Sequence, residues 1–205
     1  MKKTMIALMC MVFTIGAAMA QKTFTFGPKI GVDYTHQWGE NINDESALNY
    51  QVGAFMEYSF RDKFSIALEV VFATHARPKC EWKDWLIEEP ARDITSTYQT
   101  NYINIPVIFK YYVTKSLSID LGPQFGFKVY DKCTDKWEDS SGHWKEKHNM
   151  GHRSVDVGLG LGATYNISER VFVQARYTLG LVPLYKDKDS NARNGNTQLS
   201  IGYRF

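Results

Sequence analysis

The fold is decided by residues 64–73, which read FSIALEVVFA. Large apolar side chains occupy every second position from Phe64 to Phe72, and small or polar ones such as Ser65 and Glu69 lie between them. Successive side chains of a β-strand point to opposite faces, so this period of two predicts a strand with one apolar and one small or polar face.

The same period recurs on both sides of this segment and predicts eight strands. Their expected ranges are 24–35, 49–60, 64–75, 101–113, 117–130, 153–166, 170–183 and 197–205. Short connections at 61–63, 114–116 and 167–169 alternate with long ones at 36–48, 76–100, 131–152 and 184–196. Short periplasmic turns and long extracellular loops are typical of an outer-membrane barrel.

The bulk of the two faces indicates which one lies inside. A soluble lipocalin-like barrel would point its large apolar residues inward, but eight strands enclose room for only a modest filling of side chains. The face with Gly53, Gly122 and Gly160 fits that space, which leaves the aliphatic and aromatic residues for lipid. We therefore predict an all-β fold, an eight-stranded antiparallel transmembrane β-barrel.

Ten charged residues share the inward parity, five of each sign. They are Lys29, Asp33, Glu57, Glu69, Lys110, Asp120, Lys128, Asp156, Arg176 and Arg204. Buried charges must be paired, because removal of one partner costs roughly 3–5 kcal/mol. The balance predicts a packed ionic lumen that acts as a plug, with a narrow ion-conducting path along these groups as the alternative.

The N-terminal 20 residues have the features of a secretory signal. Lys2 and Lys3 precede an apolar run, and Ala18-Met19-Ala20 supplies a small-x-small cleavage pattern. We expect cleavage before Gln21, one barrel domain at 21–205, and localisation in the outer membrane of a Gram-negative bacterium. This domain carries equal numbers of basic and acidic residues, which disfavours nucleic acid as a partner. No later apolar run is long enough for a spanning helix.

Six short motifs follow one another along the domain. They are KIGV at 29–32, YINIPVIFKYY at 102–112, LGPQFG at 121–126, GLGLGA at 158–163, ARYTLGL at 175–181 and IGYRF at 201–205. In their order and spacing they resemble the PorT-like outer-membrane β-barrel proteins of Bacteroidota. The resemblance implies an eight-stranded barrel set among outer-membrane lipids and lipopolysaccharide, in a family in which some members are associated with secretion and gliding. The C-terminal Phe205 also resembles the signal that the barrel-assembly machinery reads.

Four of the five tryptophans fall in the second and third long loops, at Trp82, Trp85, Trp137 and Trp144. Tryptophan is over-represented among residues that carry binding energy, so we expect these loops to form an external recognition surface for a protein partner. The alternative is that these rings contact one another or the lipid headgroups.

The same two loops contain Cys80 and Cys133. Pairing of these cysteines is plausible in an oxidising compartment, and two free thiols in separate loops are the alternative.

The loop histidines His143, His148 and His152 match no zinc pattern with a cysteine pair, so the sequence predicts neither a metal nor a cofactor. No catalytic signature is present. We expect a structural, adhesive or envelope- and secretion-complex component. An outer-membrane lipid-modifying enzyme remains the alternative, and it would need an outward-facing serine–histidine pair.

Overall fold

A computed structural model describes residues 24–38, 46–76, 80–84, 92–139, 142–148, 153–183 and 192–205. The signal assigned to residues 1–20 lies outside these ranges. Within them the strands are β1 (Phe24–Trp38), β2 (Ala47–Arg61), β3 (Phe64–Ala76), β4 (Cys80–Asp84), β5 (Arg92–Tyr112), β6 (Leu117–Asp139), β7 (Gly142–His148), β8 (Val155–Asn166), β9 (Val171–Gly180) and β10 (Arg193–Tyr203). The described residues include no helix long and apolar enough to cross a bilayer.

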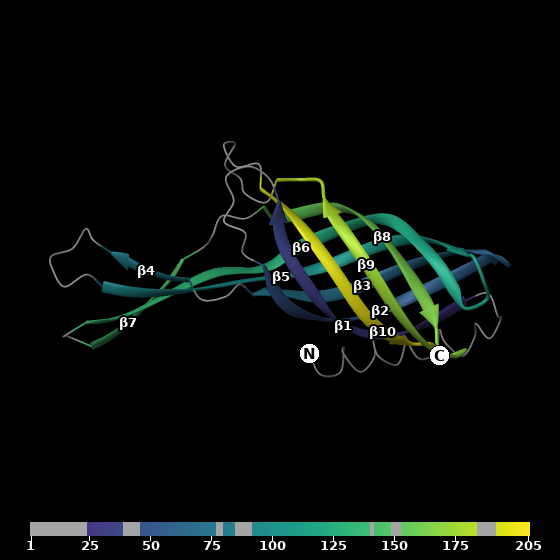
Figure 1. The fold of residues 1–205 in the computed structure, drawn as a ribbon, viewed down its shortest axis with the longest axis horizontal. Coiled ribbons are helices and arrows are strands. Elements are labelled where there is room, and N and C mark those ends of the chain that lie inside the picture. The colour runs from purple at the N-terminus through teal and green to yellow at the C-terminus, as the bar shows by residue number, and fades with distance from the viewer. Residues whose placement is uncertain are drawn as a thin grey trace, which may run out of the picture.

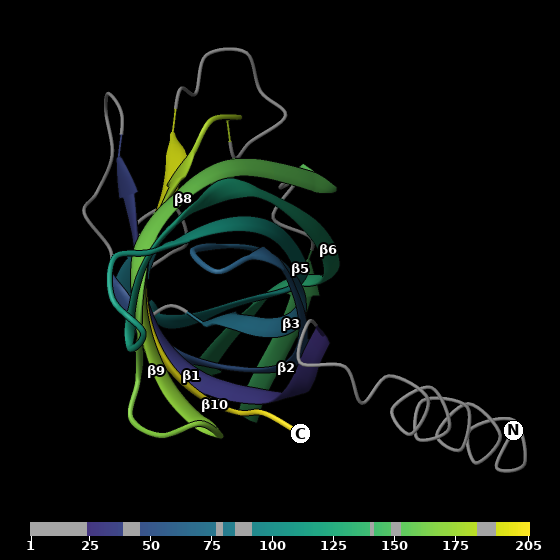
Figure 2. The same ribbon diagram turned by 90° about the vertical axis from the view of Figure 1, so that its right-hand side faces the viewer.

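Eight of these strands close into an antiparallel ring. Their order is β5-β3-β2-β1-β10-β9-β8-β6, and pairing of β6 with β5 completes the circle that Figure 2 looks into. Closure leaves no barrel strand with an unpaired edge, which a spanning sheet requires because lipid offers no hydrogen-bond partners. The predicted eight-stranded barrel is confirmed.

The two faces of the strands differ as the alternation predicts. Ile30, Val70 and Leu199 point outward and are 56%, 50% and 57% exposed, whereas the inward-facing Ser65 and Thr164 are fully buried. So much exposed apolar surface would not be tolerated in water and fits a lipid-facing wall. Near the short turns the wall carries stacked and tilted rings, from Phe60, Phe64, Phe109 and Tyr111.

Small residues allow the strands to curve closely around the lumen. A Cβ atom added at Gly122 would lie 2.0 Å from the carbonyl oxygen of Val107, and one at Gly53 would lie 2.2 Å from that of Val70. Both distances are far below contact, so a side chain at either position would force the neighbouring backbone to shift. The short connections Asp62–Lys63, 113–116 and 167–170 join neighbouring strands at one end of the ring.

The long connections differ from the prediction. Residues 76–100 and 131–152 were expected to be loops, but β5 begins at Arg92, β6 continues to Asp139, and β4 and β7 pair on their outer edges. β5 and β6 pair with each other from Tyr112↔Ser118 in the barrel to Ile94↔Trp137 in the projecting part. Figure 1 shows this part projecting from the barrel end opposite the short turns. We call β4, β7, residues 92–100 and residues 130–139 the strand extension.

A β-bulge marks the passage from the barrel to the strand extension. Tyr102 pairs with Lys128 while Asn101 pairs with Tyr130, so Val129 has no opposite residue. An extra residue in one strand reverses the alternation beyond it. Inward positions of β6 are therefore even-numbered up to Lys128 and odd-numbered from Asp131, where Asp131 and Cys133 are buried.

Candidate functional site

The lumen holds a network of buried ions. Glu69 on β3 accepts hydrogen bonds from both terminal nitrogens of Arg176, at 3.1 and 2.6 Å, and forms a 2.7 Å salt bridge with Lys29. All three side chains are at most 3% exposed. Because β3, β1 and β9 each supply one of them, the network ties together strands far apart in the chain.

A second carboxylate, Glu57, lies nearer the short turns. It accepts hydrogen bonds of 2.6 Å from Ser65 Oγ and from the Tyr112 hydroxyl. Lys110 Nζ lies 3.4 Å and an Arg204 nitrogen 3.9 Å from its other oxygen. Glu57 therefore joins β2 to β3, β5 and the C-terminal residues after β10.

Gln174 connects the Glu69 group to a third carboxylate. Its side-chain oxygen accepts a 2.5 Å hydrogen bond from Lys29, and its amide nitrogen donates to Asp120 at 2.9 Å. Asp120 also accepts from Ser118 at 2.7 Å and from Thr164 at 2.5 Å. The hydrogen-bond network thereby continues from β1 through β9 to β6 and β8.

Aromatic rings fill the space between these groups. Phe55 and Phe172 meet edge to face with centroids 5.0 Å apart, and both are buried. Lys110 Nζ lies 5.5 Å and the Arg204 guanidinium 4.6 Å from the Phe172 ring centroid. The rings and the luminal ions are therefore in direct contact inside the barrel.

Each of the ten charges expected in the lumen has the inward parity. Eight are buried, at 8% exposure or less, and Lys128 and Asp156 are partly exposed towards the outer opening. Lys128 pairs with Asp131 at 2.7 Å, and Asp156 accepts a 3.0 Å hydrogen bond from Asn194. Asp33 is fully buried, and its oxygens accept no hydrogen bond from the described residues.

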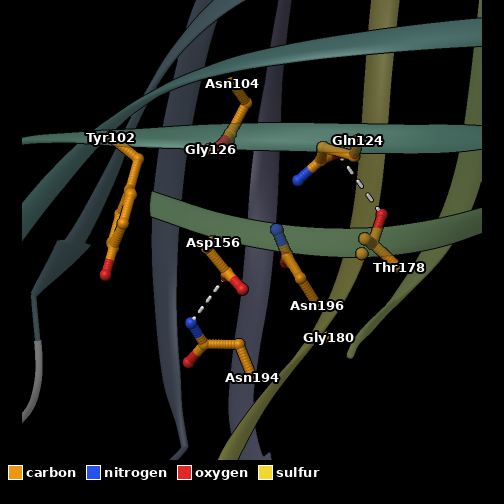
Figure 3. A pocket seen from close by; sticks show the side chains of 10 residues that line it. Tyr102, Asn104, Gln124, Gly126, Asp156, Thr178, Gly180, Asn194 and Asn196 are labelled. Atoms are coloured by element: carbon orange, nitrogen blue, oxygen red, sulfur yellow. Dashed lines mark hydrogen bonds between the residues drawn. The ribbon is translucent and has the colours of Figure 1, made fainter. Parts of the chain in front are cut away.

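A small polar pocket lies between the Glu69 group and the strand extension (Figure 3). Its lining combines hydrogen-bonding side chains with glycines, from Tyr102, Asn104, Gln124, Gly126, Asp156, Gly158, Thr178, Gly180, Asn194 and Asn196. Figure 3 shows Asp156 facing Asn194 and Gln124 facing Thr178 across it. The alternation alone could have indicated this polar set, but not its gathering at one opening.

Three of the four tryptophans expected to recognise a partner lie on strands and not in loops. Trp82 is on β4, Trp137 on β6 and Trp144 on β7, while Trp85 lies outside the described residues. The register places Trp82 opposite Ile94, Ile94 opposite Trp137, and Trp137 opposite Trp144. Three of the four tryptophans thus occupy one row across the strand extension.

The two cysteines flank β5. Cys80 pairs in register with Ser96 on one side of β5, and Cys133 pairs with Tyr98 on the other. Two strand spacings of about 4.8 Å separate β4 from β6, whereas a disulfide needs Cα atoms within about 7 Å. The disulfide stays a prediction, and it would require β4 to leave this register.

One cluster in the strand extension was not anticipated. Cys133 Sγ lies 3.2 Å from one oxygen of Asp135, and His148 Nδ1 lies 3.3 Å from the other. The bulge at Val129 and the β6–β7 pairing bring these residues to one face. Neither feature is visible in the alternation of the sequence, so the cluster could not be predicted from it. The other histidine with a described side chain, His36, lies 3.4 Å from the Tyr177 hydroxyl.

Comparison with known proteins gives one family and several similar folds. A family model described as "Outer membrane protein beta-barrel domain" matches residues 19–186. The structure of Ail, the attachment invasion locus protein of Yersinia pestis, in complex with the heparin analogue sucrose octasulfate has 13% identity and a TM-score of 0.51, covering 89% of this chain and 99% of that chain. Neisserial surface protein A also has 13% identity, with a TM-score of 0.48 and coverage of 89% and 97%. At 13% identity, the similarity to Ail shows a shared fold alone. A comparison with curated proteins finds none that matches.

Proposed function

The chain belongs to the outer membrane protein β-barrel domain family, and we propose that it is a non-enzymatic surface protein whose barrel anchors a recognition platform. In this proposal the signal is cleaved, the barrel-assembly machinery inserts the barrel, and lipids and lipopolysaccharide surround it. The strand extension lies outside the cell, where it serves adhesion or an envelope or secretion complex. The resemblance to PorT-like proteins supports the secretion-related variant of this role.

The row of tryptophans on the strand extension carries the proposal. A membrane-crossing strand needs about 9–11 residues, but β5 has 21 and β6 has 23. The surplus holds Trp137 in register with Trp144 and, through Ile94, with Trp82. Paired strands fix these positions before a partner arrives, which lowers the entropy that binding must overcome. Tryptophan is among the residue types that most often dominate interface energies.

The lumen supports an anchoring role over a transport role. Glu69, Glu57 and Asp120, together with their hydrogen-bonding and ionic partners, come from seven of the eight barrel strands, and the rings of Phe55 and Phe172 meet in the same lumen. A solute would have to break several buried ion pairs to pass, at roughly 3–5 kcal/mol each. The network therefore favours stability of a closed barrel over conduction.

The described histidines give the enzyme alternative little support. A lipid hydrolase of the serine–histidine type needs the two side chains within hydrogen-bond reach. His36 contacts Tyr177, and His148 contacts Asp135. The lipid A composition of a deletion strain, read by mass spectrometry, tests this alternative directly, and we expect it to equal that of the parent.

The recognition role is tested by replacing Trp82, Trp85, Trp137 and Trp144 together with serine. Trp38 provides a matched control, because it lies on barrel strand β1, where its indole donates to the Asn194 carbonyl at 3.3 Å and contacts Arg193. We expect the fourfold variant to reach the outer membrane and keep heat-resistant folding, but to lose both cell adhesion and the partner that crosslinks to the parent. Trp38→Phe should retain both. Equal adhesion and crosslinking by the fourfold variant would refute the recognition role.

A further inference from the structure

Three side chains with metal-binding atoms meet where β7 ends against β6. Cys133 and His148 are directly opposite each other in the antiparallel pairing, and Asp135 follows Cys133 by two residues. Their sulfur, nitrogen and oxygen atoms all lie within 4.8 Å of one another. The cluster therefore offers one thiol, one imidazole and one carboxylate at a single point.

The distances within the cluster suit a tetrahedral metal ion. Bonds of about 2.3 Å to sulfur and about 2.1 Å to nitrogen or oxygen place neighbouring ligand atoms about 3.4–3.6 Å apart. Cys133 Sγ and His148 Nδ1 lie 3.2 and 3.3 Å from oxygens of Asp135. Small side-chain adjustments would bring all three onto one ion.

Neighbouring residues fit this interpretation. Ser96 Oγ donates a 2.6 Å hydrogen bond to Asp135, the kind of second contact that orients a carboxylate ligand. Glu146 is opposite Asp135 in the register and so shares its face, which makes it a candidate for the fourth ligand position. Lys145 and Lys147 alternate with Glu146 and His148 along β7, so their charges fall on the other face.

Exposure to solvent increases across the cluster, from the buried thiol to the half-exposed imidazole. Cys133 is 2% exposed, and the side chains of Asp135 and His148 are 16% and 52% exposed. An ion can therefore enter from the histidine side and reach a sulfur that is shielded from water and from oxidants.

We propose that Cys133, Asp135 and His148 form a binding site for a divalent transition metal of the zinc type. The mixed sulfur, nitrogen and oxygen set suits Zn²⁺ and excludes Ca²⁺ and Mg²⁺, which take oxygen ligands. Binding displaces the proton that the Cys133 thiol donates to Asp135, and this proton leaves to solvent. The ion closes the β6–β7 hairpin at its base, below the pair Trp137 and Trp144.

This site and the disulfide predicted from the sequence compete for one sulfur atom. A sulfur bonded to Cys80 cannot act as a thiolate ligand. The register supports the metal, because β5 lies between β4 and β6 whereas His148 is the direct partner of Cys133. A thiol count on the unfolded, unreduced protein separates the two states.

The test uses the untagged mature protein, refolded in detergent and titrated with Co²⁺ as a spectroscopic substitute for Zn²⁺. We expect one Co²⁺ per chain, with a thiolate-to-cobalt charge-transfer band and tetrahedral visible bands that Zn²⁺ removes. Cys133→Ser should abolish the charge-transfer band, and His148→Gln should weaken binding by more than about 100-fold. His143→Gln is the matched control, since His143 pairs with Glu138 in the same hairpin at the opposite parity and should leave binding unchanged.

Heat-resistant migration of each variant on a gel shows that the barrel is folded, because neither ligand belongs to the luminal network. Absence of a charge-transfer band in the parent would overturn the proposal. So would binding that survives both ligand substitutions, or a count of no titratable thiols in the parent. A negative result in the metal titration would not affect the proposed recognition role of the tryptophans, which the fourfold tryptophan variant tests separately.

Discussion

Glu69→Gln removes the charge at the centre of the luminal network without changing the shape of the side chain. In the parent, Glu69 neutralises Arg176 through two hydrogen bonds and Lys29 through a third. After the substitution both cations stay buried, at about 1% side-chain exposure, and face a neutral amide. Loss of one partner from a buried ion pair costs about 3–5 kcal/mol, so we expect the free energy of unfolding to fall by at least that amount.

Equilibrium unfolding in guanidinium chloride, with the protein in lipid vesicles, measures this change. Ser200→Ala is the matched control, because Ser200 is equally buried but donates only a 3.5 Å hydrogen bond to the Gln174 carbonyl. Loss of this bond should cost no more than about 1 kcal/mol. A Glu69→Gln barrel as stable as the Ser200→Ala barrel would refute the view that the luminal charges hold the strands together.

Four further substitutions test the same account by equilibrium unfolding. Arg176→Leu should cost less than Glu69→Gln, because Lys29 still neutralises Glu69, and a larger loss would contradict this ranking. Val173→Arg places a charge on the outward face of β9 and should cost about 2–4 kcal/mol near the bilayer midplane. Unchanged stability of this variant would mean that the outward face does not meet lipid. Gly122→Ala should cost about 1–3 kcal/mol, because its Cβ would meet the backbone carbonyl of Val107 at 2.0 Å. Gly160→Ala should cost less, because the nearest atom to its Cβ is a side-chain carbon of Arg176 at 3.1 Å, and equal effects would contradict the close strand packing.

The barrel could be predicted from the sequence because lipid and lumen impose different chemistry on alternate residues. Leu68 and Glu69 are neighbours in the chain, and one faces outward at 40% exposure while the other is buried in an ion network. That contrast repeats in all eight barrel strands, so parity alone places the ten charges. It does not reveal which of them pair, since Glu69 meets Arg176 from 107 positions away.

The strand extension could not be predicted, because it lacks the contrast between lipid and lumen that reveals the barrel strands. Outside the membrane both faces of a strand meet water, so residues 92–100 and 130–139 show no apolar alternation. Their strands are held by backbone pairing, which leaves little trace in side-chain character. The bulge at Val129 adds a second obstacle, because it reverses the parity just before Cys133 and Asp135.

The orientation of the barrel in the membrane is the central claim, and thiol labelling on intact cells tests it most directly. Single cysteines are introduced in a Cys80→Ser, Cys133→Ser background, at Ser140 in the β6–β7 connection and at Asp62 in the short β2–β3 turn. We predict that a membrane-impermeant maleimide labels Ser140→Cys on intact cells and labels Asp62→Cys only after the outer membrane is permeabilised. Labelling of Asp62→Cys on intact cells, or protection of Ser140→Cys, would contradict the account.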